Sequence, residues 1–438
     1  MSFHIESTKE HLENTGGLVL AGELARACGL LGLVTKVRTW KGAILSMFGL
    51  LVMGRSSFEE IAIYRKDELF RETFQLEYVP ARETLRLYLG RLARTGKGIL
   101  TALCGCNARL LRLARITPLT VSMRHYIPVD VDVSVLDNSK SHKEGVGRTY
   151  MGCDGYAPVF SYIGTEGYML GYELRPGTQH SQKGTPEFLR ENLATIEKLE
   201  LPHPVLFRLD SGNDAVDSIR PLVGPGRFFL IKRNRRRDSS DYWLDTARAL
   251  GTAQQSRPGK TVYTGTITKA HPKADPDMPE FDIVFQVTVR TSDRLGNVNL
   301  VPEIEVETWW TNLFEDPEAV IALYHDHGTS EQFHSELKTD MDVERLPSGK
   351  ISVNALVLTI SMLAFNALRF IGQRALEKPD LLPTKTEVLR KRLRKVISDL
   401  ILIGCKLVAH GRRMVLRVWK DNPWLPLFDK LYTDFLAL

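Results

Sequence analysis

The spacing of apolar residues changes along the chain and divides it into three regions. Over residues 17–117 the apolar positions recur at helical spacing, as in LVLAGELARAC, which predicts a helical amino-terminal domain. From residue 127 the period becomes two, and in VDVDVSVLD the valines occupy one face of a predicted strand while Asp130 and Asp132 occupy the other. From residue 316 helical spacing returns, in a helix that runs through Lys338, an apolar helix from Val353 and a basic carboxy-terminal segment.

The middle region alternates predicted strands with predicted helices. APVFSYIG and GYMLGYELR follow the first strand, separated by a Thr-Glu-Gly turn, and predict a three-stranded antiparallel meander. Helices are predicted over residues 185–199 and 214–222, with strands in PVLFRLD and RFFLIKR. A polar stretch over residues 234–301 contains VYTGTITKA and FDIVFQVTVRT and predicts a β-rich insertion, after which IEVETWWTNL resumes the main sheet. This alternation predicts a mixed α/β fold with helices on the faces of a mixed sheet.

Length and composition indicate a folded protein with several structural units. The chain has 438 residues, more than one domain usually holds, and its 43% hydrophobic and 25% charged residues are typical of a globular protein. The predicted boundaries are 1–120 for the helical domain, 121–233 for the first part of the α/β core, 234–301 for the insertion, 302–378 for the second part of the core and 379–438 for a helical, basic carboxy-terminal segment.

Several classes of protein are excluded by the absence of their patterns. The five cysteines have neither the spacing of a disulfide scaffold nor that of a paired CxxC zinc site. The polar start MSFHIESTKEHLENTGG lacks the apolar core of a signal peptide, so the reducing cytoplasm is the expected compartment. Polar residues interrupt the apolar stretch 353–371, which favours a buried core helix over a membrane span. Without a P-loop, no nucleotide cofactor is expected.

Positive charge is concentrated in two runs, although the net charge is only +6. The first run consists of Lys232, Arg233, Arg235, Arg236 and Arg237, and the second of Arg390, Lys391, Arg392, Arg394 and Lys395. Such runs suit a phosphate backbone, because each neutralised phosphate releases counterions. A solvated helix face is the alternative for either run taken alone. DNA is therefore a candidate partner, with the first run as a candidate contact.

Three carboxylates are candidate catalytic groups, and each has a structural alternative. Asp132 lies in mid-strand, where an unpaired carboxylate is costly to bury, but the strand may simply expose a polar face. Asp210 ends an apolar strand, where α/β sheets collect ligands, but it could also cap the next helix. Glu331 shares a helical face with Tyr324, His327 and Lys338, since these four residues are spaced three, four and seven apart. An ordinary amphipathic helix remains the alternative there.

Together the three carboxylates would supply hard oxygen ligands for Mg²⁺ or Mn²⁺. Two such ions can activate an attacking oxygen and stabilise the leaving oxygen in an in-line phosphoryl displacement. Water is the nucleophile in strand cleavage, and a 3′-hydroxyl is the nucleophile in strand transfer. One site can thus perform both reactions.

The motifs around these carboxylates resemble those of insertion-sequence DDE transposases, in particular the transposase DDE domain group 1. DVDVS resembles the Asp-x-Asp-x-Thr/Ser element of that family, with Asp132 as the first catalytic carboxylate, and RLDSGN resembles its Arg-x-Asp-Ser-Gly element, with Asp210 as the second. YELRPG and WWTNL are similar to further conserved segments, and YHDHGTSEQFHSELK resembles the Tyr-x2-Arg-x3-Glu-x6-Lys signature, with Glu331 as the third. The resemblance extends from about residue 16 to the final NPW segment.

The resemblance implies a ribonuclease-H-like core and a bacterial enzyme that acts at the nucleoid. Tyr324, His327 and Lys338 would contact the DNA backbone, and the amino-terminal helices would bind terminal inverted repeats. Two protomers would pair the two ends, so a homodimer on DNA is implied, with target DNA as the second substrate.

His327 departs from the family, because the signature has an arginine at this position. Histidine is largely neutral at pH 7, so it cannot hold a constant charge on a phosphate, although it can still donate a hydrogen bond. Two alternatives therefore stand beside an active cut-and-paste transposase. The chain could be a catalytically weakened relative that keeps DNA binding, or a metal-dependent nuclease without a role in transposition.

Overall fold

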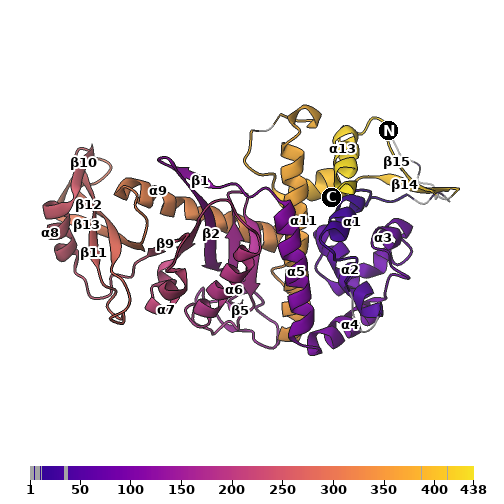
Figure 1. Ribbon diagram of the computed structural model, residues 1–438, viewed down its shortest axis with the longest axis horizontal. Helices are drawn as coiled ribbons and strands as arrows, with labels where there is room; N and C mark the ends of the chain where they lie inside the picture. Colours follow the sequence, from indigo (N-terminus) through magenta and orange to yellow (C-terminus); the bar gives the residue numbers. More distant parts are fainter. Residues whose placement is uncertain (1–3, 5–9, 11, 34–37, 386, 412) are drawn as a thin grey trace.

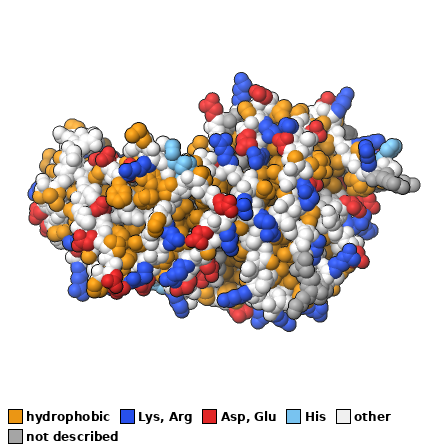
Figure 2. Space-filling model, in the orientation of Figure 1, with side chains coloured by type: hydrophobic (Ala, Val, Ile, Leu, Met, Phe, Trp, Pro, Cys, Tyr) orange, Lys and Arg blue, Asp and Glu red, His pale blue; other side chains and the backbone are white. Residues whose placement is uncertain are grey.

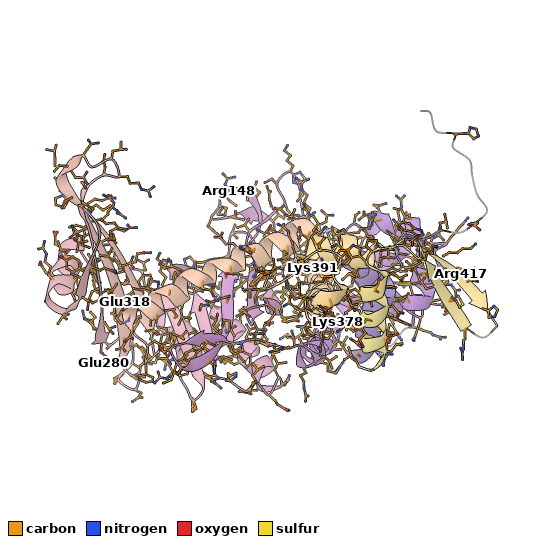
Figure 3. All side chains as sticks on the ribbon, turned by 90° about the horizontal axis from the view of Figure 1, so that it is seen from above. Arg148, Glu280, Glu318, Lys378, Lys391 and Arg417 are labelled. Carbon is orange, nitrogen blue, oxygen red and sulfur yellow. The ribbon has the colours of Figure 1, made fainter. Side chains whose placement is uncertain are left out.

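The molecule is elongated, with a helical domain at one end, a β-rich insertion at the other and an α/β sheet between them (Figure 1). The computed structural model describes the chain except for residues 1–3, 5–9, 11, 34–37, 386 and 412. Viewed from above, the chain runs from Glu318, near the insertion, toward Lys391 in the helical domain, and Arg417 lies near the opposite end (Figure 3). The mixed α/β class predicted from the sequence is confirmed.

The helical domain forms as the apolar spacing predicts. Its helices are α1 (Leu18–Ala27), α2 (Arg38–Val52), the 3₁₀ helix η1 (Phe58–Tyr64), α3 (Glu68–Thr73), α4 (Arg82–Arg94) and α5 (Lys97–Leu113). On α4, Leu85, Leu89 and Leu92 are buried at helical spacing, whereas the charged residues between them face solvent. Asp67 caps α3, because its carboxylate accepts a hydrogen bond from Phe70 N at 2.7 Å.

A mixed sheet forms the centre of the molecule, in the order β10-β11-β12-β13-β9-β8-β2-β6-β7. Its central strands are β2 (Arg124–Val133), β6 (Val159–Ile163), β7 (Tyr168–Glu173), β8 (Val205–Leu209) and β9 (Arg227–Lys232), and the short β1 (Leu119–Val121) pairs with β2. The predicted meander is present as the antiparallel strands β2, β6 and β7. Strands β2, β8 and β9 are parallel, connected through α6 (Thr185–Glu197), η2 (Ser211–Asn213), α7 (Val216–Ile219) and η3 (Arg220–Leu222).

A small second sheet lies beside the carboxyl end of β2, in the order β3-β5-β4. Its strands are β3 (Leu136–Asp137), β4 (Gly147–Arg148) and β5 (Asp154–Tyr156). The loop between β4 and β5 carries Tyr150, whose hydroxyl donates a hydrogen bond to Val133 O at 3.0 Å. This bond ties the small sheet to the end of β2.

The insertion extends the central sheet and also contains a helix that we did not predict from the sequence. Its elements are α8 (Ser240–Leu250), β10 (Thr252–Arg257), β11 (Lys260–Lys269), β12 (Phe281–Ser292) and β13 (Val298–Thr311). Strand β13 pairs with β12 along most of its length and with β9 at its last three residues, so the predicted boundary between 301 and 302 falls inside one strand. Trp243 and Leu244 of α8 are buried where this helix packs against the sheet.

The helix predicted from residue 316 through Lys338 is interrupted. The chain forms α9 (Pro317–Asp326), a 3₁₀ turn η4 (His327–Thr329), α10 (Ser330–Ser335) and a π-helical segment η5 (Glu336–Asp340). Pro317 lies in the first turn of α9, where a missing N–H costs nothing. The changes of helical winding fall at His327 and Glu336, both of which are buried and engaged by charged partners.

The apolar helix from Val353 is α11 (Ile351–Leu376), and 83% of its most apolar 18-residue window is buried inside the protein. It is long and apolar enough to cross a membrane, but it packs against α2, α5 and β7 and is the core helix predicted from the sequence. The predicted core boundary at residue 378 therefore cuts between elements that pack together.

The carboxy-terminal segment is not wholly helical as predicted, because it contains a β-hairpin. After η6 (Pro379–Leu381), α12 (Leu393–Val396) and η7 (Ile397–Ile401), the strands β14 (Cys405–His410) and β15 (Arg413–Val418) pair antiparallel. Val408, Val415, Leu416 and Val418 give these strands the β-branched and apolar content that favours a ladder. The final helix, α13 (Leu425–Leu436), packs against α1, so the two ends of the chain share one domain.

Candidate active site

The register of two parallel strands places Asp132 and Asp210 side by side. Val131 on β2 pairs with Leu209 on β8, and each aspartate is the next residue along its strand. The two carboxylates therefore lie at the carboxyl edge of the sheet, the position at which α/β sheets bind ligands. Gly212 keeps space around the second of them, because a Cβ there would lie 2.9 Å from Ser181 Oγ and 3.2 Å from both carboxylate oxygens of Asp210.

The two aspartates have opposite shifts in pKa. Burial and the negative charge of Asp132 raise the pKa of Asp210, although Asn213 Nδ2 donates a hydrogen bond to its Oδ1 at 2.6 Å. Burial also acts to raise the pKa of Asp132, but interactions with His334, the charge of His327 and the Val133 N–H lower it overall. The pair is thus a concentration of negative charge that a cation would stabilise.

A buried ion-pair network supports the strand beneath this pair. Arg208 donates to both carboxylate oxygens of Asp130, with Nε at 2.6 Å and Nη2 at 2.8 Å, and its Nη1 reaches Asp326 Oδ2 at 2.8 Å. His327 Nδ1 lies 2.8 Å from Asp130 Oδ1. Asp130 is therefore a structural support for the site. His327, a predicted DNA contact, is buried and directed at Asp130 instead of at solvent.

Two further residues lie at the aspartates and were missed by the sequence reasoning. His334 Nε2 lies 3.4 Å from Asp132 Oδ2, without the alignment of a hydrogen bond, and its Nδ1 lies 3.2 Å from the Tyr162 hydroxyl. Tyr150 lies close enough for the charges of Asp132 and Asp210 to help burial raise its pKa to about 12. The spacing of His334, seven residues after His327, would have placed both on one helical face.

Tyr324 and Lys338 also lie within electrostatic reach of the aspartates. Burial, followed by the charges of Asp210 and Asp132, raises the pKa of the Tyr324 hydroxyl. Burial lowers the pKa of Lys338, and the charges of Glu344 and Asp132 oppose that shift. Lys232 Nζ lies 5.9 Å from the centre of the Tyr324 ring. Two predicted DNA contacts, together with Lys232 from the first basic run, therefore gather near the two carboxylates.

Glu331 is not joined to the aspartates in this structure. Its position lies between His327 and His334 on the same helical stripe, but its side chain is exposed and lines a cavity of about 540 Å³ with Ser335, Arg390 and other residues. Within the described part of the chain, no hydrogen bond or ion pair connects Glu331 to Asp132 or Asp210. Glu336, five residues later, is buried and pairs with Arg369 Nη2 at 2.8 Å.

The five side chains of the first basic run, all predicted DNA contacts, differ in their burial and in their partners. The side chain of Arg233 is 9% exposed, and its guanidinium lies 5.6 Å and 5.5 Å from the ring centres of Trp243 and Trp310 and pairs with Asp238 at 2.7 Å. Burying the guanidinium between two indoles stabilises the junction of insertion and sheet.

The other members of the run are less buried. Lys232 pairs with Glu307 at 2.8 Å, and Arg236 pairs with Asp214 at 3.6 Å. Arg235 donates to Ser240 Oγ at 3.2 Å, and Arg237 is exposed. On the face shown in Figure 2, Lys and Arg side chains are interspersed with Asp and Glu over the whole surface. Of this run, Arg237 is the residue most open to a phosphate.

The second basic run is largely paired with acidic side chains of the fold. Asp340 accepts a hydrogen bond from Arg392 Nε at 2.8 Å and forms an ion pair with Arg394 Nε at 3.3 Å. Asp399 pairs with Lys391 at 3.0 Å and with Lys395 at 3.2 Å. The Asp340 pairs hold α12 against η5, and the Asp399 pairs join η7 to the residues around α12.

The side chains present fit a divalent cation in part. Asp132 and Asp210 are adjacent oxygen donors of the type that Mg²⁺ and Mn²⁺ prefer, and each raises the cost of charge on the other. Among the residues that the structure describes, however, no group of three His, Cys, Asp or Glu side chains is arranged to hold a metal ion. Glu331, on the facing helix, stays the predicted third carboxylate.

Comparisons with known proteins identify the family. No curated protein matches the chain. Among solved structures, a piggyBac transposase synaptic complex with hairpin DNA is similar at 11% sequence identity, covering 89% of this chain and 80% of that chain with a TM-score of 0.41. The family model of the transposase DDE domain group 1 matches residues 119–438, well over half of the chain. The chain therefore belongs to this family and is a DNA transposase, an enzyme that cleaves and transfers DNA strands.

Proposed function

We propose that this transposase cuts DNA at the ends of a bacterial insertion sequence and joins the freed 3′-hydroxyls to target DNA by a cut-and-paste route. The observation that carries the proposal is the strand register that places Asp132 beside Asp210 at the edge of the sheet. A ribonuclease-H-like core, implied by the family resemblance, would present its carboxylates from neighbouring elements in this way. The proposed cofactor is Mg²⁺ or Mn²⁺, with two ions held by Asp132, Asp210 and Glu331.

Glu331 completes the site in this proposal by turning toward the aspartates when DNA and cation bind. Its side chain is exposed and makes no hydrogen bond or ion pair within the described residues, so a change of rotamer breaks neither kind of bond. Its neighbours His327 and His334 already reach the aspartates on β2 from the same helical stripe. When bound, the divalent ions supply activation of the attacking oxygen and stabilisation of the leaving oxygen.

The remaining polar side chains of the site position the DNA. Lys338, near Asp132, and Lys232, beside Tyr324, place positive charge where the scissile phosphate has to lie. The Tyr324 hydroxyl stays protonated at neutral pH, because burial and the two aspartates raise its pKa, so it can donate a hydrogen bond to a phosphate oxygen. His327 acts through Asp130 in this conformation, which differs from the phosphate contact that the signature arginine implies.

The helical domain is the proposed binding site for the terminal inverted repeats. It includes both ends of the chain, since α1 packs against α13, and it lies away from the aspartates along the long axis (Figure 1). A protein of this shape can hold the end of the element in one region while the cleavage site reaches β2 and β8. Pairing of the two ends requires two protomers, so a homodimer on DNA is part of the proposal.

The proposal is tested with purified protein, Mg²⁺ and a labelled duplex that carries the DNA flanking the coding sequence. Cut-and-paste activity predicts nicking at the element end followed by joining of that end to a second duplex. Binding without nicking would favour the catalytically weakened relative, for which the histidine at position 327 is the observation. Nicking without joining would favour a metal-dependent nuclease.

A further inference from the structure

The hairpin formed by β14 and β15 has two chemically different faces. In an antiparallel pair, residues directly opposite each other point to the same side, and the side changes at every residue. One face therefore carries the pairs Leu407–Leu416 and Ala409–Met414, together with Cys405–Val418. Leu416 and Val418 pack against the hydrophobic core, so this apolar face is directed at the body of the protein.

The opposite face is basic. It carries the pairs Lys406–Arg417, Val408–Val415 and His410–Arg413. Arg413, Arg417 and His410 are exposed, and 37% of the Lys406 side chain is exposed. Lys406 pairs with Glu10 at 2.8 Å, whereas neither Arg413 nor Arg417 forms an ion pair with any residue that the structure describes.

This face places like charges opposite each other, which is unfavourable in an isolated hairpin. Lys406 lies directly across the ladder from Arg417, and like charges at opposite positions destabilise a strand pair. Glu10 offsets this repulsion at Lys406, whereas Arg413 and Arg417 form no ion pair with any residue that the structure describes, so their two guanidinium groups stay available to an anion. The arrangement points to a ligand that carries several negative charges.

The spacing of the cations fits the backbone of duplex DNA. Lys406 and His410 are four residues apart on β14, which at about 3.3 Å per residue separates the two cationic pairs by roughly 13 Å. The major groove of B-DNA is about 12 Å wide and admits a two-stranded ribbon. One cationic pair can therefore lie near each wall of phosphates, with Val408 and Val415 over the groove between them.

We propose that the basic face of the β14–β15 hairpin binds duplex DNA through the phosphates on both sides of the major groove. The hairpin lies at the helical end of the molecule, and Figure 3 shows Arg417 on it, far from Glu318 beside the insertion. A DNA contact at the hairpin therefore lies away from Asp132 and Asp210. It strengthens DNA binding but takes no part in the cleavage reaction. The inference deepens the proposed function, since it names a surface by which the transposase holds DNA.

The test compares DNA binding by two triple variants that lose the same net charge. The hairpin variant is Lys406→Gln, Arg413→Gln and Arg417→Gln, and the control replaces three exposed cations of the insertion, Arg248→Gln, Lys273→Gln and Arg294→Gln. Affinity for a random-sequence duplex is measured over a range of salt concentrations without divalent metal. The hairpin variant is expected to bind at least about tenfold more weakly, and the slope of log affinity against log salt should fall by about two to three. The control should retain both values.

Further measurements separate this inference from the proposed function. A variant with Arg413→Lys and Arg417→Lys keeps the charge and should bind like wild type. Because binding is measured without cleavage, a failure of wild-type protein to cut end DNA leaves the hairpin result interpretable. Thermal unfolding of the hairpin variant should stay close to wild type, since Arg413 and Arg417 are exposed and the Lys406–Glu10 pair lies at the surface. Equal loss in both triple variants, or unchanged binding by the hairpin variant, would overturn the inference. A change in self-association alone would also overturn it and would assign the face to a second copy of the chain.

Discussion

The two halves of the candidate active site are held in place by different means. On the sheet, Asp132 and Asp210 are fixed by strand register, by backbone and side-chain hydrogen bonds and by the buried Asp130–Arg208 pair below them. On the facing helix, the winding changes at His327 and again at Glu336, and the exposed Glu331 between them makes no ion pair within the described residues. Asp132 and Asp210 are therefore already positioned in the absence of DNA, and we call them the fixed half of the site. Glu331 can change its rotamer, and we call it the adjustable half.

This difference explains how a site for divalent cations can be encoded without three carboxylates in contact. Three converging negative charges repel one another, and with two carboxylates the charge of Asp132 already adds to the effect of burial, which is the main cause of the raised pKa of Asp210. An exposed third carboxylate avoids this cost until cation and phosphate are present. If this division holds, variants of the fixed half, of the adjustable half and of their supporting residues should differ in their effects on cleavage, stability and DNA binding.

Asp132→Asn and Asp210→Asn should each lower the rate of DNA cleavage by on the order of 10³-fold or more, because each removes a charged donor for the cations. Binding of duplex DNA without metal should be retained. Single-turnover nicking of a labelled end duplex, with filter binding alongside, measures both properties. Normal cleavage by either variant would remove that aspartate from the site.

Glu331→Gln should lower cleavage by on the order of 10²- to 10³-fold, while the free energy of unfolding changes by less than about 0.5 kcal/mol because the side chain is exposed. Glu336→Gln is the matched comparison on the same stretch of chain. Glu336 pairs with the buried Arg369, so its variant should lose about 3–5 kcal/mol of stability. Denaturant unfolding and nicking assays on both variants separate the roles. A stable but inactive Glu336 variant with an active Glu331 variant would reverse the assignment.

Removing the buried Asp130–Arg208 ion pair, which supports strand β2 at the two aspartates, should lower the stability of the fold. Arg208→Met leaves Asp130 buried without its bidentate partner, and the expected loss is about 3–5 kcal/mol in the free energy of unfolding. Arg227→Met, which removes an exposed pair with Glu197, should cost less than about 1 kcal/mol. Equal losses in the two variants would contradict the role given to the buried network.

The same network predicts how stability depends on pH. Burial opposes ionisation of Asp130, but Arg208 and His327 lower its pKa below the ordinary value of 3.8. The folded state therefore binds this proton less readily than the unfolded state, so the contribution to stability is complete above about pH 4 and is lost as pH falls through the folded pKa. Denaturant unfolding between neutral pH and acid should show this loss in wild type. In Asp130→Asn this component of the acid dependence should be missing.

His327→Ala should reduce cleavage by about 10- to 100-fold, with little change in the salt dependence of DNA binding, because the imidazole orients Asp130 and does not point at solvent. A change of about one in the salt slope would show instead that His327 contacts a phosphate, as the family signature implies.

The smallest effect is expected in the first basic run. Arg237→Gln should weaken duplex binding a few-fold and reduce the salt slope by about one, since Arg237 is exposed. Arg233→Gln should leave that slope unchanged and lower the thermal unfolding temperature, because the guanidinium is packed between Trp243 and Trp310. The reverse pattern would restore Arg233 as a DNA contact.

Elements specified by local patterns of residues could be predicted from the sequence, whereas features that depend on contacts between distant residues could not. Alternating valines predicted β2, and helical spacing predicted the amino-terminal domain and the buried α11, because these patterns are local. The hairpin β14–β15 was missed because it lies in a basic stretch where charge masks the alternation, whereas Trp243, Leu244 and Ala247 recur at helical spacing and are a signal that predicts α8. The interrupted helix around Glu331 was missed for another reason: His327 and Glu336 are engaged by residues distant in sequence, Asp130 and Arg369. For the site, the motifs name Asp132 and Asp210, and the register of β2 and β8 brings these two positions together, but no pattern reveals that Arg233 is enclosed by two tryptophans.

The central claim is that Asp132, Asp210 and Glu331 together hold divalent cations once DNA is bound. A calorimetric titration of Mn²⁺ into the protein–duplex complex tests this claim for wild type and for the three single variants. Asp132→Asn and Asp210→Asn are expected to abolish tight binding, and Glu331→Gln to weaken it at least about tenfold. Wild-type affinity for Mn²⁺ in the Glu331→Gln complex would contradict the account.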